Sequence, residues 1–228
     1  MPFSTSLFSV LFSAGVFLVT SLPVAVAIPN QPTVSGWQQL KDLFGPRRRR
    51  GGTRGGFCLI TPGYRGEPIW SDRPLLVWQK PNQSLKRIEI RTNDQTVVWS
   101  QNLPSTAQTI AYQGTALQPH QTYQVVLYNT QDQPLIKVDY LLPQFTLVSA
   151  AERQRVQQEL LQIEHKLKAQ ASTVEAIALN RATYFVQNQY WSDALQTLYS
   201  VPHPSPELIQ LLAAIEAEAC GLSSRLEG

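Results

Sequence analysis

Charged side chains are scarce in this chain of 228 residues, in which Asp, Glu, Lys and Arg together make up only 15%. The 19 basic and 16 acidic residues give a formal net charge of +3, which is too low for a dedicated nucleic-acid binder. Residues 1–27 have no ionisable side chain. Hydrophobic residues nevertheless reach 43%, so the chain can bury a core and is not disordered overall.

Motifs of catalysis and metal binding are also missing. The sequence has no G-x-S-x-G nucleophile elbow, no H-E-x-x-H zinc motif and no phosphate-binding P-loop. Its two cysteines form no C-x-x-C pair, and its three histidines (His120, His165 and His203) are far apart. We therefore expect a protein that is not an enzyme and that holds no metal and no cofactor.

The uncharged N-terminus has the pattern of an export signal. The apolar stretch from Leu7 to Thr20 covers 14 residues, fewer than the ~20 that a membrane-spanning helix needs. Pro23 and the small-residue pattern Ala25-Val26-Ala27 follow it. We expect a signal peptide over 1–27, cleaved after Ala27, and a location in the periplasm, in the cell envelope or outside the cell. The alternative is an uncleaved N-terminal membrane anchor.

Export would place Cys58 and Cys220 in a compartment that permits disulfides. A bond between them would close a very long loop, which in the chain-entropy model stabilises the fold by about 4–5 kcal/mol. The alternative is two buried thiols that pack as small hydrophobic side chains.

The excess positive charge lies in a Pro-, Gly- and Arg-rich arm over 28–56. Guanidinium groups bind phosphate, sulfate and carboxylate through paired hydrogen bonds. We expect the arm to bind an anionic component of the cell envelope, a membrane surface or an acidic protein partner, and not nucleic acid. The alternative is a solvated linker or a clamp folded onto the body. The arginines concerned are Arg47, Arg48, Arg49, Arg50 and Arg54.

A short amphipathic pattern interrupts this arm. Trp37, Leu40, Leu43 and Phe44 share one face of a helix about two turns long. So short a helix is marginal by itself, and its apolar face must therefore dock on something. It packs either on the protein's own domain or on a membrane interface or partner groove.

From Phe57 to Val148 the apolar residues alternate with a period of two, and turn-forming residues separate the runs. Short strands at this spacing, without helices between them, predict an antiparallel β-sandwich over 57–148. The expected strands are 57–60, 75–79, 85–92, 96–101, 106–112, 122–130 and 134–141.

Two motifs in this region resemble a fibronectin type III domain of the immunoglobulin-like class. They are Pro74-Leu75-Leu76-Val77-Trp78 and the Leu-x-Pro-x-x-Thr-Tyr segment that runs from Leu117 to Tyr123. The resemblance implies that Trp78 fills the core between the sheets. It also implies that the Tyr123 hydroxyl bonds to the backbone a few residues upstream, as a tyrosine corner. Such a domain is usually a spacer or a binding module.

At Ser149 the apolar period changes to 3.6, which predicts a helical domain over 149–221 and a tail over 222–228. The patterns Ser149-x-x-Glu152 and Ser172-x-x-Glu175 are capping boxes that begin the first two helices. A third helix is expected over 190–200, and a fourth begins after Ser205-Pro206. The expected fold class is therefore α+β, a sandwich followed by a helical bundle.

The second and third predicted helices resemble a single tetratricopeptide unit, which implies close packing of the two helices. A self-standing array needs about three repeats, so we expect these helices to pack on each other and on the sandwich. The alternative is an exposed groove near Ala182, Phe185 and Trp191, which would make the protein an assembly adaptor. The matching residues are Ala178, Ala182, Phe185, Trp191, Ala194, Leu198 and Pro206.

The whole order of elements resembles the exported cyanobacterial family called domain of unknown function 928. The match consists of the segment Gly52-Thr53-Arg54-Gly55-Gly56-Phe57-Cys58, the sandwich, the helices and the late Cys220. The chain departs from that pattern in Phe57, which separates the glycines from Cys58. The resemblance implies an envelope or periplasmic protein and supports the cysteine pair, and it assigns no catalytic residue.

The leading hypothesis is thus an exported, non-enzymatic interaction protein whose arm binds an anionic surface or a partner. A second interpretation uses the aromatic segment 64–78, with Tyr64, Trp70 and the acids Glu67 and Asp72, as a carbohydrate-binding or carbohydrate-active site.

Overall fold

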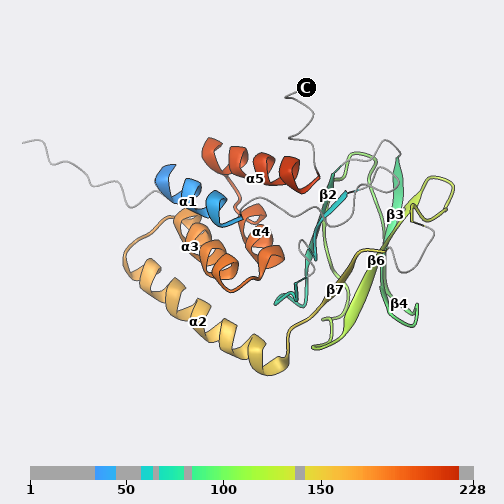
Figure 1. Ribbon diagram of the computed structural model, residues 1–228, viewed down its shortest axis with the longest axis horizontal. Helices are drawn as coiled ribbons and strands as arrows, with labels where there is room; N and C mark the ends of the chain where they lie inside the picture. Colours follow the sequence, from blue (N-terminus) through green and yellow to red (C-terminus); the bar gives the residue numbers. More distant parts are fainter. Residues whose placement is uncertain (1–33, 45–57, 64–66, 80–83, 137–141, 221–228) are drawn as a thin grey trace, which may run out of the picture.

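A computed structural model describes residues 34–44, 58–63, 67–79, 84–136 and 142–220. In these ranges seven strands form two antiparallel sheets, and five helices gather on one side of them (Figure 1). The expected mixture of helices and antiparallel strands is confirmed. The predicted signal peptide, the five arginines of the arm, Tyr64 and the tail lie outside the described residues.

The two sheets use strands from one continuous part of the chain. The first has the order β1-β2-β5, with β1 at Cys58–Thr61, β2 at Leu75–Gln79 and β5 at Thr109–Ala111. The second has the order β4-β3-β6-β7, with β4 at Val97–Asn102, β3 at Leu85–Thr92, β6 at Thr122–Asn129 and β7 at Gln144–Thr146.

The side chains that alternate inward from both sheets form one core. Trp78 is 1% exposed and packs with Leu76 of its own strand and with Ile88 and Val125 of the facing sheet. The prediction that Trp78 fills the space between the sheets is therefore confirmed. Burial of an aromatic side chain of this size is among the largest single apolar contributions to folding.

Only residues 134–136 of the last predicted strand, 134–141, lie within the described residues. Pro134 forms an isolated bridge with Tyr128 of β6, and the N–H of Leu135 donates to the carbonyl of Leu127 at 2.9 Å. A further strand, β7, also pairs with β6 and was not predicted. Phe145 of β7 is 2% exposed, and its ring stacks 5.7 Å from that of Tyr123. Ile136, part of the alternating pattern, instead packs in a separate cluster with Tyr128. The pattern thus marked residues that cover the outer face of the sheet.

The five helices are α1 (Val34–Phe44), α2 (Ala150–Ala169), α3 (Val174–Gln187), α4 (Trp191–Tyr199) and α5 (Pro206–Ala219). Ser149 caps α2 by accepting from the N–H of Glu152 at 3.0 Å, and Ser205 caps α5, both as predicted. The cap of α3 is Thr173 and not Ser172. Ser172 instead donates its N–H to the carbonyl of Leu167 and so completes the turn that ends α2.

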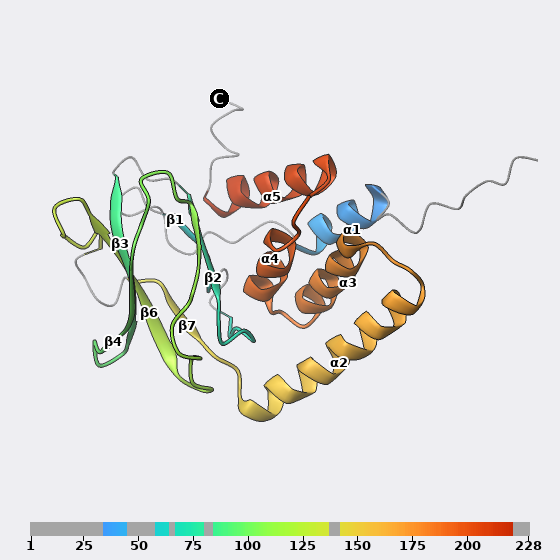
Figure 2. The same cartoon turned by 180° about the vertical axis from the view of Figure 1, so that it is seen from behind.

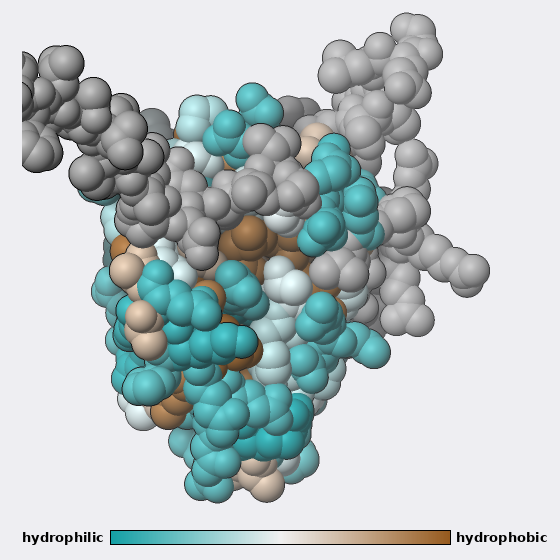
Figure 3. Space-filling model, turned by 90° about the vertical axis from the view of Figure 1, so that its left-hand side faces the viewer, coloured by the Kyte–Doolittle hydropathy of each residue, from teal (hydrophilic) through white to brown (hydrophobic). Residues whose placement is uncertain are grey.

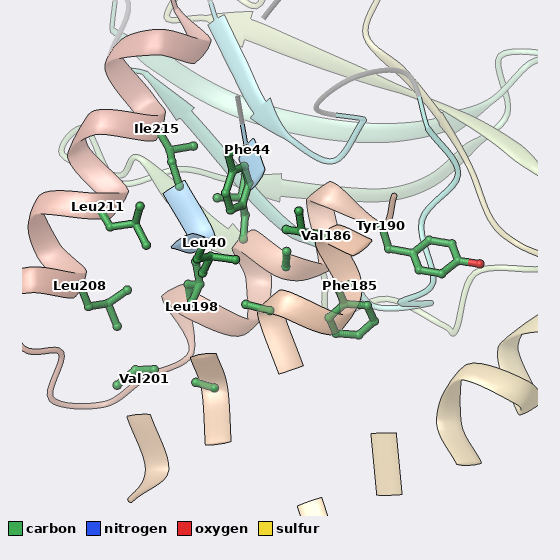
Figure 4. Close-up of a cluster of buried hydrophobic side chains, with 14 of the residues drawn as sticks. Leu40, Phe44, Phe185, Val186, Tyr190, Leu198, Val201, Leu208, Leu211 and Ile215 are labelled. Atoms are coloured by element: carbon green, nitrogen blue, oxygen red, sulfur yellow. The ribbon is translucent and has the colours of Figure 1, made fainter. Parts of the chain in front are cut away.

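Helix α1 packs against α3 and α5 (Figure 4). Trp37, Leu40 and Phe44 are 4%, 0% and 1% exposed, so this face docks on the protein's own helices and is not open to a membrane. The side chain of Leu43 lies outside the described residues. Residues 34–44 therefore belong to the helical unit, although the sequence analysis placed them in a separate arm.

The helical unit and the sandwich share part of their cores. Ile60 of β1 and Val77 of β2, 1% and 2% exposed, belong to the same cluster as the helices. A disulfide joins Cys58, at the start of β1, to Cys220, which follows α5, with an S–S distance of 2.08 Å. The predicted cysteine pair is thus present. Figure 2 shows α4 and α5 beside the first sheet. In the described ranges no helix is both long and apolar enough to cross a bilayer.

Candidate functional site

Tyr123 is part of the sandwich framework. Its ring is 3% exposed, and its hydroxyl accepts a hydrogen bond of 2.9 Å from the backbone N–H of Gln118, five residues upstream. This is the contact predicted for Tyr123 from the sequence. Tyr123 thus fixes the turn that leads into β6.

A cavity of about 370 Å³ lies where α2, α3 and α4 meet residues 70–71 of the sandwich. Its walls are mainly apolar, and polar side chains lie among them and at its border. In Figure 3 apolar surface gathers in the middle of the face on which the helices lie and is bordered by hydrophilic surface. The apolar lining consists of Trp70, Val174, Ile177, Ala178, Phe185 and Val201.

Packing between α3 and α4 shapes this cavity. Ala182 and Ala194, both 0% exposed, have short side chains at the helix contact, so the two backbones can approach closely. Helix α2 packs on α3, and in Figure 1 it runs at an angle below both α3 and α4. The cavity is lined from all three helices, with Val174, which is 65% exposed, at its border.

Contacts within the protein fix the position of Trp70, which forms one wall of the cavity. The indole Nε1–H donates to the carbonyl of Arg153 at 3.1 Å, and the ring centroid lies 5.7 Å from that of Phe185. The guanidinium of Arg153 stands 5.8 Å from the Trp70 ring and pairs with Asp72 at 2.6 Å. The segment chosen for the carbohydrate interpretation therefore uses Trp70 and Asp72 to join the sandwich to α2.

A buried carboxylate fixes the same segment to α4. Asp193 is 3% exposed, and its two oxygens accept from the backbone N–H groups of Trp70 and Ser71, each at 2.8 Å. Burial raises the pKa of Asp193 to about 7, and the negative charge of Glu67 adds to this effect. The two backbone hydrogen bonds act in the opposite direction.

Other side chains of α4 also form hydrogen bonds with this part of the sandwich. The amide of Gln196 accepts from the N–H of Leu75 at 3.0 Å and donates to the carbonyl of Arg73 at 3.2 Å. The hydroxyl of Ser192 accepts from the N–H of Gly63 at 2.9 Å and pairs with Glu67. This role of α4 was not predicted from the sequence. The available signal was the spacing of three polar residues, at 192, 193 and 196, along one side of α4.

Two cations share one carboxylate at the cavity. One oxygen of Glu164 pairs with Arg181, and the other lies 3.4 Å from the Nζ of Lys168. The Arg181 side chain is 26% exposed, and burial lowers its pKa, although a guanidinium keeps its charge at any physiological pH. These three side chains have a net charge of +1.

The alternative of an exposed groove at Ala182, Phe185 and Trp191 has no support from the burial of these side chains. Ala182 and Phe185 are 0% and 1% exposed, and the half-buried Trp191 has its ring 5.5 Å from that of Phe44. The three histidines are exposed. In the part of the chain that the structure describes, no group of three or more His, Cys, Asp or Glu residues could hold a metal ion.

Comparison with models of known protein families gave no match, and neither did a comparison with curated proteins.

Proposed function

We propose that this protein is an exported, non-enzymatic interaction protein and that the cavity between α2, α3, α4 and Trp70 is its binding site. The observation that carries the proposal is the combination of apolar walls with acidic groups that are already engaged inside the protein. Both oxygens of Asp193 and both oxygens of Glu164 have partners. Such a cavity is suited to binding.

The disulfide supports the export part of this proposal. Bonds such as that between Cys58 and Cys220 persist in oxidising compartments and are rare in the cytosol. The apolar N-terminus and the resemblance to the exported cyanobacterial family point in the same direction. We place the protein in the periplasm or the cell envelope.

The finer fold assignment is also a proposal. The strand orders β1-β2-β5 and β4-β3-β6-β7, with the hydrogen bond from Gln118 to Tyr123, support an immunoglobulin-like sandwich of the fibronectin type III kind. The close packing of α3 on α4 supports a single tetratricopeptide-like hairpin. Both kinds of unit commonly serve in recognition, which agrees with a binding role.

A second binding element is proposed for the arginine run. The run, Arg47–Arg50 with Arg54, stands in the chain between Phe44, which is buried among the helices, and Cys58, which the disulfide holds. Five guanidinium groups so close in sequence favour an anionic partner, either an envelope polymer or a membrane surface. The carbohydrate interpretation of 64–78 has less support, because Trp70 is engaged by Arg153 and Phe185.

The experiment for the cavity is titration of the full chain with Nile red, an uncharged apolar dye, followed by fluorescence. Ile177 lines the cavity, and Ile177→Trp should fill it and weaken dye binding at least tenfold. Ile209→Trp is the matched control, because Ile209 is 53% exposed on α5 and does not line the cavity. Equal affinity in the two variants, or no dye binding to the unchanged protein, would overturn the proposal.

The arginine run has a separate test. The full chain is sedimented with anionic and with neutral vesicles, and with envelope polysaccharide, over a series of salt concentrations. Binding to the anionic material should weaken as salt rises, because exposed charges are screened. The change of Arg47–Arg50 to Ala should abolish that binding. Unchanged binding by this variant would mean that the run is not the anion-binding element.

A further inference from the structure

Arg181 is placed to meet a ligand inside the cavity. It lies on α3 between two cavity-lining residues, three positions after Ala178 and four before Phe185, which is the spacing of one helical face. Arg181 itself lines the cavity. A cation that borders apolar walls is costly to bury without an anion, so its partners decide what the cavity can accept.

The ion pair with Glu164 leaves most N–H donors of the Arg181 guanidinium available among the described residues. A guanidinium has five N–H donors, and among the described residues Arg181 bonds only to Glu164, through Nη1. Glu164 in turn divides its two oxygens between Arg181 and Lys168. One carboxylate thus serves two cations, and a second anion would balance the charge of the group.

The remaining polar groups of the lining are already engaged within the protein. Thr197 and Ser200 donate their hydroxyls to the carbonyls of Asp193 and Gln196, at 2.8 and 2.6 Å. Gln196 bonds to the segment 71–75, and Asp193 accepts from Trp70 and Ser71. Arg181 and Lys168 are therefore the groups of the lining that can best form a new hydrogen bond or ion pair with a ligand.

We propose that the cavity binds a small apolar molecule or residue that ends in one carboxylate, with Arg181 as the anion-binding residue and Lys168 as a supporting cation at the border. The proposal rests on the proposed binding function. The apolar part of the ligand lies along Trp70, Ile177 and Phe185, and its carboxylate takes the remaining donors of Arg181. A volume of about 370 Å³ is near the lower end of the ~300–1,000 Å³ of small-molecule sites, which fits a small ligand.

Two sources offer this chemistry, a medium-chain fatty acid and the C-terminal residue of an apolar peptide. Calorimetric titration of the full chain with decanoate and decan-1-ol tests the first source. Titration with N-acetyl-phenylalanyl-leucine and its amide tests the second. In at least one pair the acid should bind at least tenfold more tightly than its uncharged partner, and the pair that shows this preference identifies the source.

The variant that tests the assignment is the triple change Arg181→Met, Lys168→Met and Glu164→Gln, which removes both cations without leaving the carboxylate of Glu164 unpaired. It should bind acid and uncharged partner equally. Arg155→Met is the matched control, because Arg155 pairs with Glu152 and Glu159 on the exposed side of α2. It removes the same charge outside the cavity and should keep the preference. Arg181→Lys keeps the charge and should retain part of it.

The outcomes separate this inference from the proposed function. Equal binding of acid and uncharged partner by the unchanged protein, with Nile red still bound, overturns the carboxylate assignment and leaves the cavity as a binding site. A preference that survives in the triple variant also overturns it. If neither the dye nor any of the four compounds binds, the proposed function fails together with the inference.

Discussion

The sandwich and the helical unit reach a buried core by different routes. The sandwich takes its core from one continuous part of the chain, and strands that follow one another in sequence supply its facing side chains. The core of the helical unit brings together α1, α3, α4 and α5 with Ile60 and Val77 of the sandwich. The sandwich can close on itself, whereas the helical unit needs residues from both ends of the described chain.

The buried acidic side chains of the two regions also differ in where their partners lie. Glu89 of β3 is 5% exposed and is paired within its own sheet, by Arg87, Arg91 and Tyr128. Asp193 of α4 is paired instead by backbone groups of the sandwich. The comparison indicates that the helical unit depends on the sandwich more than the sandwich depends on the helices.

The largest expected effect is that of removing the disulfide. The double change Cys58→Ser with Cys220→Ser opens a loop with a sequence separation of 162 residues, and the free energy of unfolding should fall by about 5 kcal/mol in the chain-entropy model. Hydrogen exchange should show protection lost in α1 and α5 before β3 and β6. Earlier loss in β3 and β6 would contradict the dependence described above.

The second largest loss of stability is expected from truncating a core side chain of the helical unit. Phe44→Ala removes a ring that is 1% exposed and should lower the free energy of unfolding by about 3–5 kcal/mol, measured by urea denaturation. Leu161→Ala is the control, because Leu161 is 53% exposed and its loss should change stability by less than about 0.5 kcal/mol. A cost for Phe44→Ala as small as that of the control would show that α1 does not dock on the helices.

The pH dependence of stability tests the contact between Asp193 of α4 and the backbone of Trp70 and Ser71. The pKa of Asp193 is raised from 3.8 to about 7 in the folded protein, so between these values the native state holds a proton that the unfolded chain has released. Stability should therefore fall as pH rises from about 4 to about 7, by on the order of 3 kcal/mol. Asp193→Asn, which does not titrate, should flatten this part of the curve.

The control for that slope is Asp94→Asn. Asp94 is exposed, and its pKa is lowered chiefly by the hydrogen bond from Thr92, so it titrates below the pH window of Asp193. This variant should keep the decline between pH 4 and pH 7. Parallel curves for the unchanged protein and Asp193→Asn would show that Asp193 does not carry the pH effect.

The smallest expected effect lies in the sandwich. Tyr123→Phe keeps the buried ring and removes only the oxygen that accepts from Gln118, which should cost about 1–2 kcal/mol because a backbone N–H loses its partner. Thermal unfolding of the variant measures this cost. A change as large as that of Phe44→Ala would mean that the turn before β6 is as critical as the shared core.

The sandwich was the more predictable region, for a physical reason. Alternation with a period of two and turn residues are local signals, and they placed β2 and β3 at their observed bounds and put Trp78 in the core. The same signals did not predict β7, whose Phe145 stacks on the ring of Tyr123.

The helical unit was less predictable because its contacts are distant in sequence. The amphipathic pattern at Trp37 and Leu40 predicted a docking face but could not identify what it packs against. The clamp of Asp193 on Trp70 joins residues more than 120 positions apart. The cavity is lined by three helices and a strand-connecting segment, and no local pattern encodes such a meeting.

The disulfide has a consequence for proteolysis. Residues 58–220 form a covalently closed ring, since the bond between Cys58 and Cys220 joins its two ends. A single cut in the backbone anywhere inside this ring produces no separate fragment. A protease that nicks an exposed loop, such as the turn at 131–132, would leave one molecule of unchanged mass apart from the added water. The two pieces would separate only after reduction of the disulfide, so the nicked protein remains one covalent molecule.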